Sequence, residues 1–313
     1  MKLPPRYKLL SDPSSTFNVT KSGHLYELES VNHKGYLPDQ LEGIKRNQIT
    51  TFSKDSRRRM IKAVSAFGER CPIFGTTTYD DPMPTVKEAK RDNDVFMRRM
   101  LRKYPGHWIV WRMEFQPKSG RPHFHYLIYG QEKTPFVPHQ WFRENWRSVT
   151  GRDSLWPEVK GMRSHRGGIY YASKYLCKED EEGFQKYKDY HPGTKVGRFW
   201  GIAGRENIPD DSTDTAFSTE DYKWLLLHMV KDKAERSIKR DLRKQGKTWD
   251  EIDAEWGSPN WDQRVMDLAR QLWRKNGMPT WTCNDETNFL DRTIRLSKNS
   301  NTHADIDYVF RFC

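Results

Sequence analysis

Two runs of alternating residues, 107–116 and 123–129, constrain the fold of this chain more than any other feature. Both runs are rich in β-branched and aromatic side chains. The six residues between them, 117–122, include a glycine and two prolines. This pattern predicts a β-hairpin, in which successive side chains alternate between the two faces of a sheet.

The hairpin carries a set of side chains that can bind a metal. His123 and His125 occupy alternate positions, so both imidazoles are expected on one face, and the loop can bring Glu114 opposite them, since cross-strand neighbours lie about 5 Å apart. A carboxylate with two imidazoles suits Mg²⁺ or Mn²⁺, although Zn²⁺ would also bind. The alternatives are a polar strand edge for the histidines and a salt bridge from Glu114 to Arg112 or Arg121.

A second cluster of reactive side chains follows the hairpin. If a helix runs over 169–178, Tyr171, Lys174, Tyr175 and Lys178 share one face. Cations near a phenol favour its phenolate form, and they also neutralise phosphate. These residues and the metal predict attack of Tyr171 on a phosphodiester, which leaves a 5′-phosphotyrosine and a free 3′-hydroxyl. The alternative is an exposed amphipathic helix with cation–π pairs.

Three segments resemble the ordered motifs of the HUH endonucleases, in particular the rolling-circle replication initiator (Rep) proteins of plasmids and of single-stranded DNA phages and viruses. Residues 74–79 (FGTTTY) resemble the first motif, 122–125 (PHFH) match the second, and 171–174 (YASK) match the core of the third. The resemblance covers about residues 70–205. Gly75 departs from the pattern, because the family often has a bulky residue there.

The resemblance implies an enzyme that nicks and rejoins single-stranded origin DNA with the help of a divalent metal, Mg²⁺ or Mn²⁺. It assigns the metal ligands to Glu114, His123 and His125. It assigns the catalytic roles to Tyr171 and Lys174, while Tyr175 fits either a second nucleophile or a packing residue.

The distribution of charge agrees with a polyanionic partner. The chain has a formal net charge of +12; residues 1–205 hold 37 basic and 22 acidic side chains, and residues 206–313 hold 17 and 20. Single-stranded origin DNA is the expected partner, and a host helicase is a further candidate. Basic residues near the site are the expected phosphate contacts, namely Lys118, Arg121, Arg163, Arg166 and Lys178.

Composition excludes several other classes of protein. The mean hydropathy is −0.96, and no apolar run approaches the ~20 residues that span a bilayer, so no membrane partner is expected. The first residues lack the apolar core of a secretory signal, which predicts a cytoplasmic protein of a prokaryotic host. The four cysteines lie far apart, which argues against a disulfide framework or a structural zinc site.

The expected fold class is α+β, with a central antiparallel sheet flanked by helices and followed by a helical C-terminal module. Helices are expected over 54–67, 87–104 and 141–149, and further strands over 72–79, 155–162 and 198–202. We expect an irregular N-terminal arm (1–55), an HUH endonuclease domain (56–205), a linker (206–217) and the helical module (218–313).

Two other functions fit the same residues. Single-strand transposases and conjugative relaxases share the motif set, although relaxases usually carry a three-histidine cluster, which this sequence lacks. A non-catalytic nucleic-acid-binding protein with a decayed site is the other alternative, and the presence of every expected site residue argues against it.

Overall fold

A computed structural model gives the structure of the protein and describes the greater part of the chain. The described residues are 16–22, 25–30, 52–67, 70–132, 135–152, 155, 157–162, 168, 171, 181–256, 258–276 and 281–283. Within them, no helix combines the length and the hydrophobicity needed to cross a bilayer.

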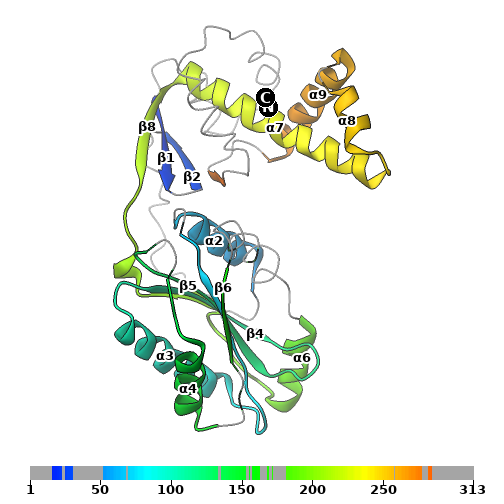
Figure 1. Ribbon diagram of the computed structural model, residues 1–313. Helices are drawn as coiled ribbons and strands as arrows, with labels where there is room; N and C mark the ends of the chain where they lie inside the picture. Colours follow the sequence, from blue (N-terminus) through cyan, green and yellow to red (C-terminus); the bar gives the residue numbers. More distant parts are fainter. Residues whose placement is uncertain are drawn as a thin grey trace, which may run out of the picture. The chain divides into compact units, whose positions relative to one another are not determined.

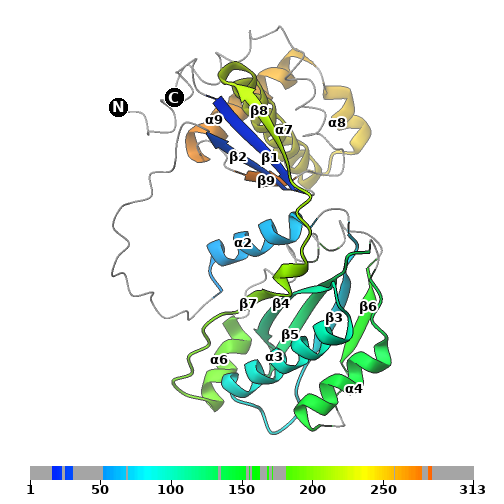
Figure 2. The same cartoon turned by 90° about the vertical axis from the view of Figure 1, so that its left-hand side faces the viewer.

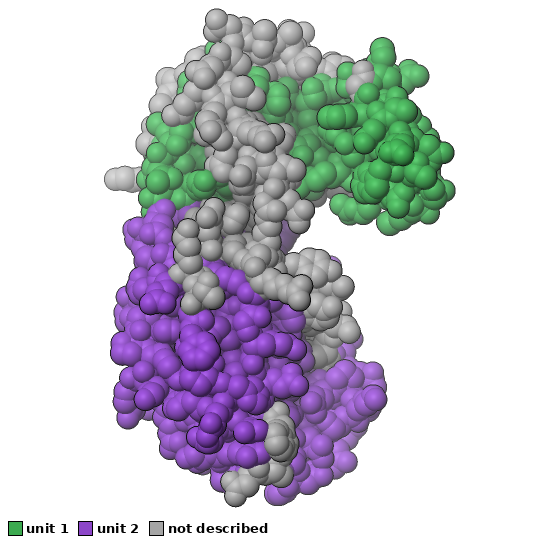
Figure 3. Space-filling view, in the orientation of Figure 1, with its two compact units in different colours: residues 1–21, 25–39, 212–313 green, residues 22–24, 40–211 purple. Residues whose placement is uncertain are grey.

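The chain divides into two compact units (Figure 3). Unit 2 consists of Ser22–His24 and Gln40–Asp211, and unit 1 combines residues from both ends of the chain, Met1–Lys21, Leu25–Asp39 and Ser212–Cys313. The chain therefore enters unit 2 from unit 1 and returns to unit 1 near residue 212, within the segment 206–217 that the sequence suggested as a linker.

Unit 1 corrects the prediction of an irregular arm over 1–55. Strands β1 (Thr16–Ser22) and β2 (Leu25–Ser30) pair with strands from the other end of the chain, β8 (Thr213–Ser218) and β9 (Trp281–Cys283), in the order β8-β1-β2-β9. The C-terminal part is therefore not purely helical, as predicted, because it supplies two strands. Phe17 and its register partner Phe217 are both buried, which shows what drives this long-range pairing.

Three helices accompany the sheet of unit 1, namely α7 (Thr219–Lys244), α8 (Trp249–Glu255) and α9 (Pro259–Asn276). Thr248 and Glu251 form the reciprocal cap that starts α8, as their spacing in the sequence indicates. Phe17 of β1 stacks on Tyr222 of α7 with ring centroids 4.1 Å apart, so the sheet and the long helix share one core.

Unit 2 is built on a five-stranded sheet in which all paired strands are antiparallel, in the order β6-β3-β5-β4-β7 (Figure 1). The strands are β3 (Ile73–Thr77), β4 (Trp108–Phe115), β5 (Pro122–Tyr129), β6 (Glu158–Gly161) and β7 (Trp200–Ala203). The predicted α+β class with a central antiparallel sheet is confirmed, and the predicted hairpin forms the middle of the sheet as β4 and β5.

Helices cover both faces of this sheet (Figure 2). On one face, α3 (Val86–Lys103) and α4 (His139–Thr150) pack through Phe96, whose ring centroid lies 5.5 Å from that of Tyr126 on β5. On the other face, α2 (Lys54–Ser65) is followed by Phe67, whose ring lies 5.0 Å from that of Tyr129.

Two further pieces complete the described part of unit 2. Helix α6 (Glu181–Tyr190) packs against the end of β4, and a short 3-10 turn, Arg205–Asn207, follows β7. Most of the helix predicted over 169–178 lies outside the described residues, although Tyr171 itself is helical.

The structure explains the unusual glycine of the first motif. Gly75 lies in the middle of β3, on the face covered by α4, and a Cβ at this position would lie 2.8 Å from Cζ of Phe142. The aromatic ring of α4 therefore occupies the space that a larger residue on β3 would take.

We predict that Gly75→Ala lowers the free energy of unfolding by about 1–3 kcal/mol, because the new methyl group would force Phe142 to move in a packed core. Gly161→Ala on β6 is the matched control, since its Cβ would meet no atom within 4 Å. Chemical denaturation measures both changes, and equal stability of the two variants would contradict the packing described for β3 and α4.

Candidate active site

The hairpin places four polar side chains on the face of the sheet that α2 covers. Glu114 of β4 is paired with His123 of β5, and Arg112 is paired with His125. Residues paired across antiparallel strands point to the same face, so the four side chains form one polar group within the sheet.

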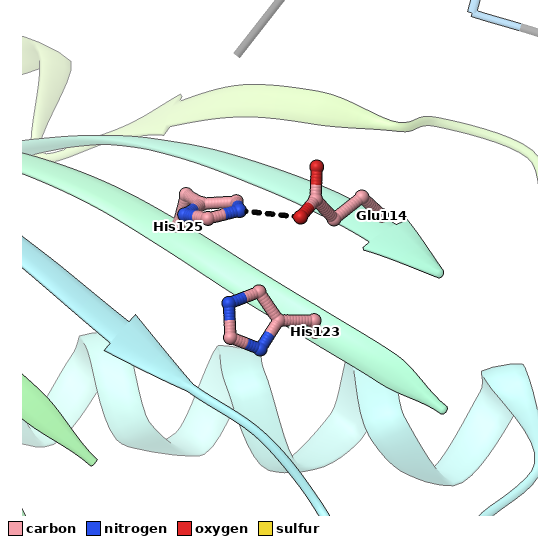
Figure 4. Close-up of side chains that lie close together, drawn as sticks. All are labelled: Glu114, His123 and His125. Carbon is pink, nitrogen blue, oxygen red and sulfur yellow. Dashed lines mark hydrogen bonds and ion pairs between the residues drawn. The ribbon is translucent and has the colours of Figure 1, made fainter. Parts of the chain in front are cut away.

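Glu114, His123 and His125 converge closely enough to share one cation (Figure 4). Each offers one ligand atom, and these atoms all lie within 4.8 Å of one another. Nε2 of His125 lies 2.6 Å from Oε1 of Glu114. Since a carboxylate only accepts hydrogen bonds, Nε2 is the donor in this contact.

The electrostatics of the cluster keep its members in the form that binds metals. Burial raises the pKa of Glu114, but the hydrogen bond from His125 and the nearby charges of His125, His123 and Arg112 outweigh it and hold this pKa below its usual value. Burial, assisted by His125 and opposed by Glu114, lowers the pKa of His123 to about 3. A divalent metal requires an ionised carboxylate and neutral imidazoles, which this environment favours.

A further observation shows that the residues fit a metal ion. Nδ1 of His123 is buried and has no hydrogen-bond partner among the described residues. A buried polar atom without a partner is costly in a stable fold, so its presence at a cluster of ligand atoms calls for a functional explanation. Two imidazoles and one carboxylate suit Mg²⁺ or Mn²⁺, as the sequence predicts, and the donor set alone does not select between them.

Tyr171 lies beside this cluster. Its hydroxyl oxygen is 3.4 Å from Nδ1 of His125, and its ring centroid is 4.4 Å from that of Phe74 on β3. Phe74 also lies against His125, with ring centroids 5.9 Å apart. The phenol that the sequence selected as the nucleophile therefore contacts a predicted metal ligand, and Phe74 supports both rings.

Arg112 is an unexpected member of the site. Its side chain is completely buried, its Nη1 donates to the carbonyl oxygen of Met113 at 2.6 Å, and its guanidinium lies 4.0 Å from the centroid of Phe52, just before α2. The sequence suggested Arg112 only as a salt-bridge partner of Glu114. Burial of such a cation on an aromatic ring depends on a segment 60 residues away, which local alternation does not reveal.

The predicted DNA contacts divide into two groups. Lys118 is exposed in the hairpin turn, whereas Arg121 donates to Asp81 at 2.6 Å, so that a phosphate would have to compete with a carboxylate. The other candidates lie outside the described residues, together with two residues of the predicted nucleophile helix: Arg163, Arg166, Lys178, Lys174 and Tyr175.

Comparison with known protein families agrees with this geometry. Residues 72–180 match a family of replication-associated proteins, the ORF2 family. The matched segment holds the metal-binding cluster, Phe74 and Tyr171, and the cluster is compatible with an HUH motif. No curated protein and no solved structure showed a significant match to the chain. The family match supports a replication-associated protein, which agrees with the resemblance noted in the sequence.

We predict that Glu114→Gln weakens binding of Mn²⁺ by at least about tenfold, because the amide cannot supply the negative charge that the cluster contributes. Glu158→Gln, which neutralises an exposed carboxylate of β6, is the matched control and should bind as the wild type does. Titration calorimetry measures both affinities, and an equal effect of the two substitutions would exclude Glu114 as a ligand.

The low pKa of His123 also predicts a dependence of stability on pH. Between pH 6.5 and 3 the unfolded chain binds a proton at His123 and the folded chain does not, so stability in metal-free buffer falls as the pH is lowered. This contribution is about 2 kcal/mol at pH 5, and His123→Gln should remove it. Unfolding at pH 7 and pH 5 measures it, with His139→Gln on exposed α4 as the control; an unchanged pH dependence in His123→Gln would refute the assignment.

Proposed function

We propose that the chain nicks and rejoins single-stranded origin DNA in rolling-circle replication, with Tyr171 as the nucleophile. The observation that carries this proposal is the contact of the Tyr171 hydroxyl with His125, one of the three residues that can hold a metal. Covalent phosphodiester chemistry needs a nucleophile beside an electrophilic activator, and these groups meet that requirement within one face of a sheet.

In this mechanism Glu114, His123 and His125 hold the divalent cation, which, when bound, polarises the scissile phosphate and neutralises its charge. Tyr171 supplies the attacking oxygen. Its phenol loses a proton, a bond forms between this oxygen and phosphorus, and the bond from phosphorus to the 3′ oxygen breaks as that oxygen gains a proton. The 5′-phosphotyrosine keeps the energy of the phosphodiester, so attack by a 3′-hydroxyl reverses the step and rejoins the strand.

The surrounding residues orient these groups. Phe74 packs against the ring of Tyr171, and Arg112 adds a buried positive charge next to Glu114. Lys174 follows Tyr171 by three residues in the sequence, and we assign it to stabilise the phenolate and the phosphate. Tyr175 is retained as a candidate second nucleophile, and Lys118, Arg121, Arg163, Arg166 and Lys178 as candidate phosphate contacts.

A transposase or relaxase of the same superfamily would use the same residues on a different DNA substrate. The match to replication-associated proteins favours replication. A DNA-binding protein without catalysis is the remaining alternative, and it leaves the buried donor atoms of the cluster without a purpose.

We predict that Tyr171→Phe abolishes the covalent adduct with a single-stranded oligonucleotide in the presence of Mn²⁺, because the substituted ring has no oxygen to attack phosphorus. Tyr170→Phe is the control, since it removes the neighbouring hydroxyl and should still form the adduct. Mass spectrometry of tryptic peptides locates the modified residue. An adduct on Tyr175 in the variant would refute the choice of nucleophile, and absence of any adduct in the wild type would refute the proposed chemistry.

A further inference from the structure

Helix α2 carries an unusual concentration of positive charge. Its 12 residues, KDSRRRMIKAVS, include five basic side chains and one acidic side chain, Asp55. Lys54, Arg58 and Arg59 are exposed, and no ion pair or hydrogen bond from their side chains to the described part of the chain is present. We name these three residues the α2 basic face. Burial of Met60 and Val64 against the core turns this face toward solvent.

The helix lies on the face of the sheet that bears the metal-binding cluster. Phe67, just after α2, packs on Trp108 and Tyr129, with ring centroids 5.7 and 5.0 Å apart. Tyr129 lies on β5 at an even spacing from His123 and His125, so its side chain points to the same face as theirs.

The beginning of α2 is held at the level of the cluster. Phe52 lies on the guanidinium of Arg112, and Nε1 of Trp200 donates to Oγ of Ser56 at 2.9 Å. Trp200 is paired with Arg112 across β7 and β4, and Arg112 is paired with His125 across β4 and β5. One row of paired residues therefore leads from the start of the helix to a metal ligand.

We infer that the α2 basic face binds the phosphate backbone of the DNA strand whose scissile phosphate is held at the cluster. The identity of this ligand rests on the proposed function; the position and charge of the helix do not. A nucleic acid carries a phosphate at every residue, so a strand held at the cluster extends past neighbouring parts of the same face, where exposed cations without protein partners can neutralise it.

The opposite face of the sheet supplies a matched comparison. Helix α3 carries three exposed basic residues, Lys87, Arg102 and Lys103, and it packs on the face that points away from the cluster. A nonspecific effect of net charge on DNA binding would depend on both sets equally, whereas a strand that passes the cluster would contact α2 and not α3.

The test compares two triple variants, Lys54→Gln/Arg58→Gln/Arg59→Gln on α2 and Lys87→Gln/Arg102→Gln/Lys103→Gln on α3. Binding of a fluorescent single-stranded oligonucleotide is measured over a range of salt concentrations. Loss of three phosphate contacts should weaken binding by the α2 variant about tenfold at 0.1 M salt and reduce the slope of log Kd against log salt by about 2. The α3 variant should remain within about twofold of the wild type.

Further arms separate the possible outcomes. Lys54→Arg/Arg58→Lys/Arg59→Lys keeps the charge and should restore the salt dependence, and thermal unfolding of all variants verifies the fold. Equal losses in the α2 and α3 variants, an unaffected α2 variant, or a loss confined to duplex DNA would each overturn the inference. Failure of the wild type to form an adduct would count against the proposed function alone, because the binding comparison requires no cleavage.

Discussion

The register between β4 and β5 is the constraint on which the rest of the site depends. It pairs Glu114 with His123 and Arg112 with His125, and so gathers two imidazoles, a carboxylate and a guanidinium on one face. Because side chains alternate along a strand, a shift by one residue would turn the imidazoles toward α3 and α4 and remove the site altogether. Burial of Met113 and Phe124, a paired set on the other face, opposes that shift.

The same arrangement trades stability for chemistry. His123 is held neutral by its surroundings and keeps a buried nitrogen without a partner among the described residues, and Arg112 is a fully buried cation. Each of these is unfavourable on its own. Phe52 and the carbonyl of Met113 compensate Arg112, and we attribute the remaining cost at His123 to the requirement for a metal ligand.

Local patterns in the sequence predicted much of this arrangement. Alternation over 107–116 and 123–129 predicted the hairpin and the shared face of His123 and His125, because both depend only on the geometry of a strand. The pairing of β1 with β8 was missed, because strands so short carry little periodic signal and the partner lies about 200 residues away. The buried position of Arg112 was missed for a similar reason, since its aromatic partner Phe52 belongs to another segment.

Convergence of the phenol and the metal ligands is the central claim, and anomalous diffraction from crystals of the protein soaked with Mn²⁺ tests it most directly. The account predicts one strong anomalous peak bonded to Glu114, His123 and His125, with the hydroxyl of Tyr171 facing the same ion. A peak elsewhere in unit 2, or a Tyr171 side chain turned away from an occupied cluster, would contradict it.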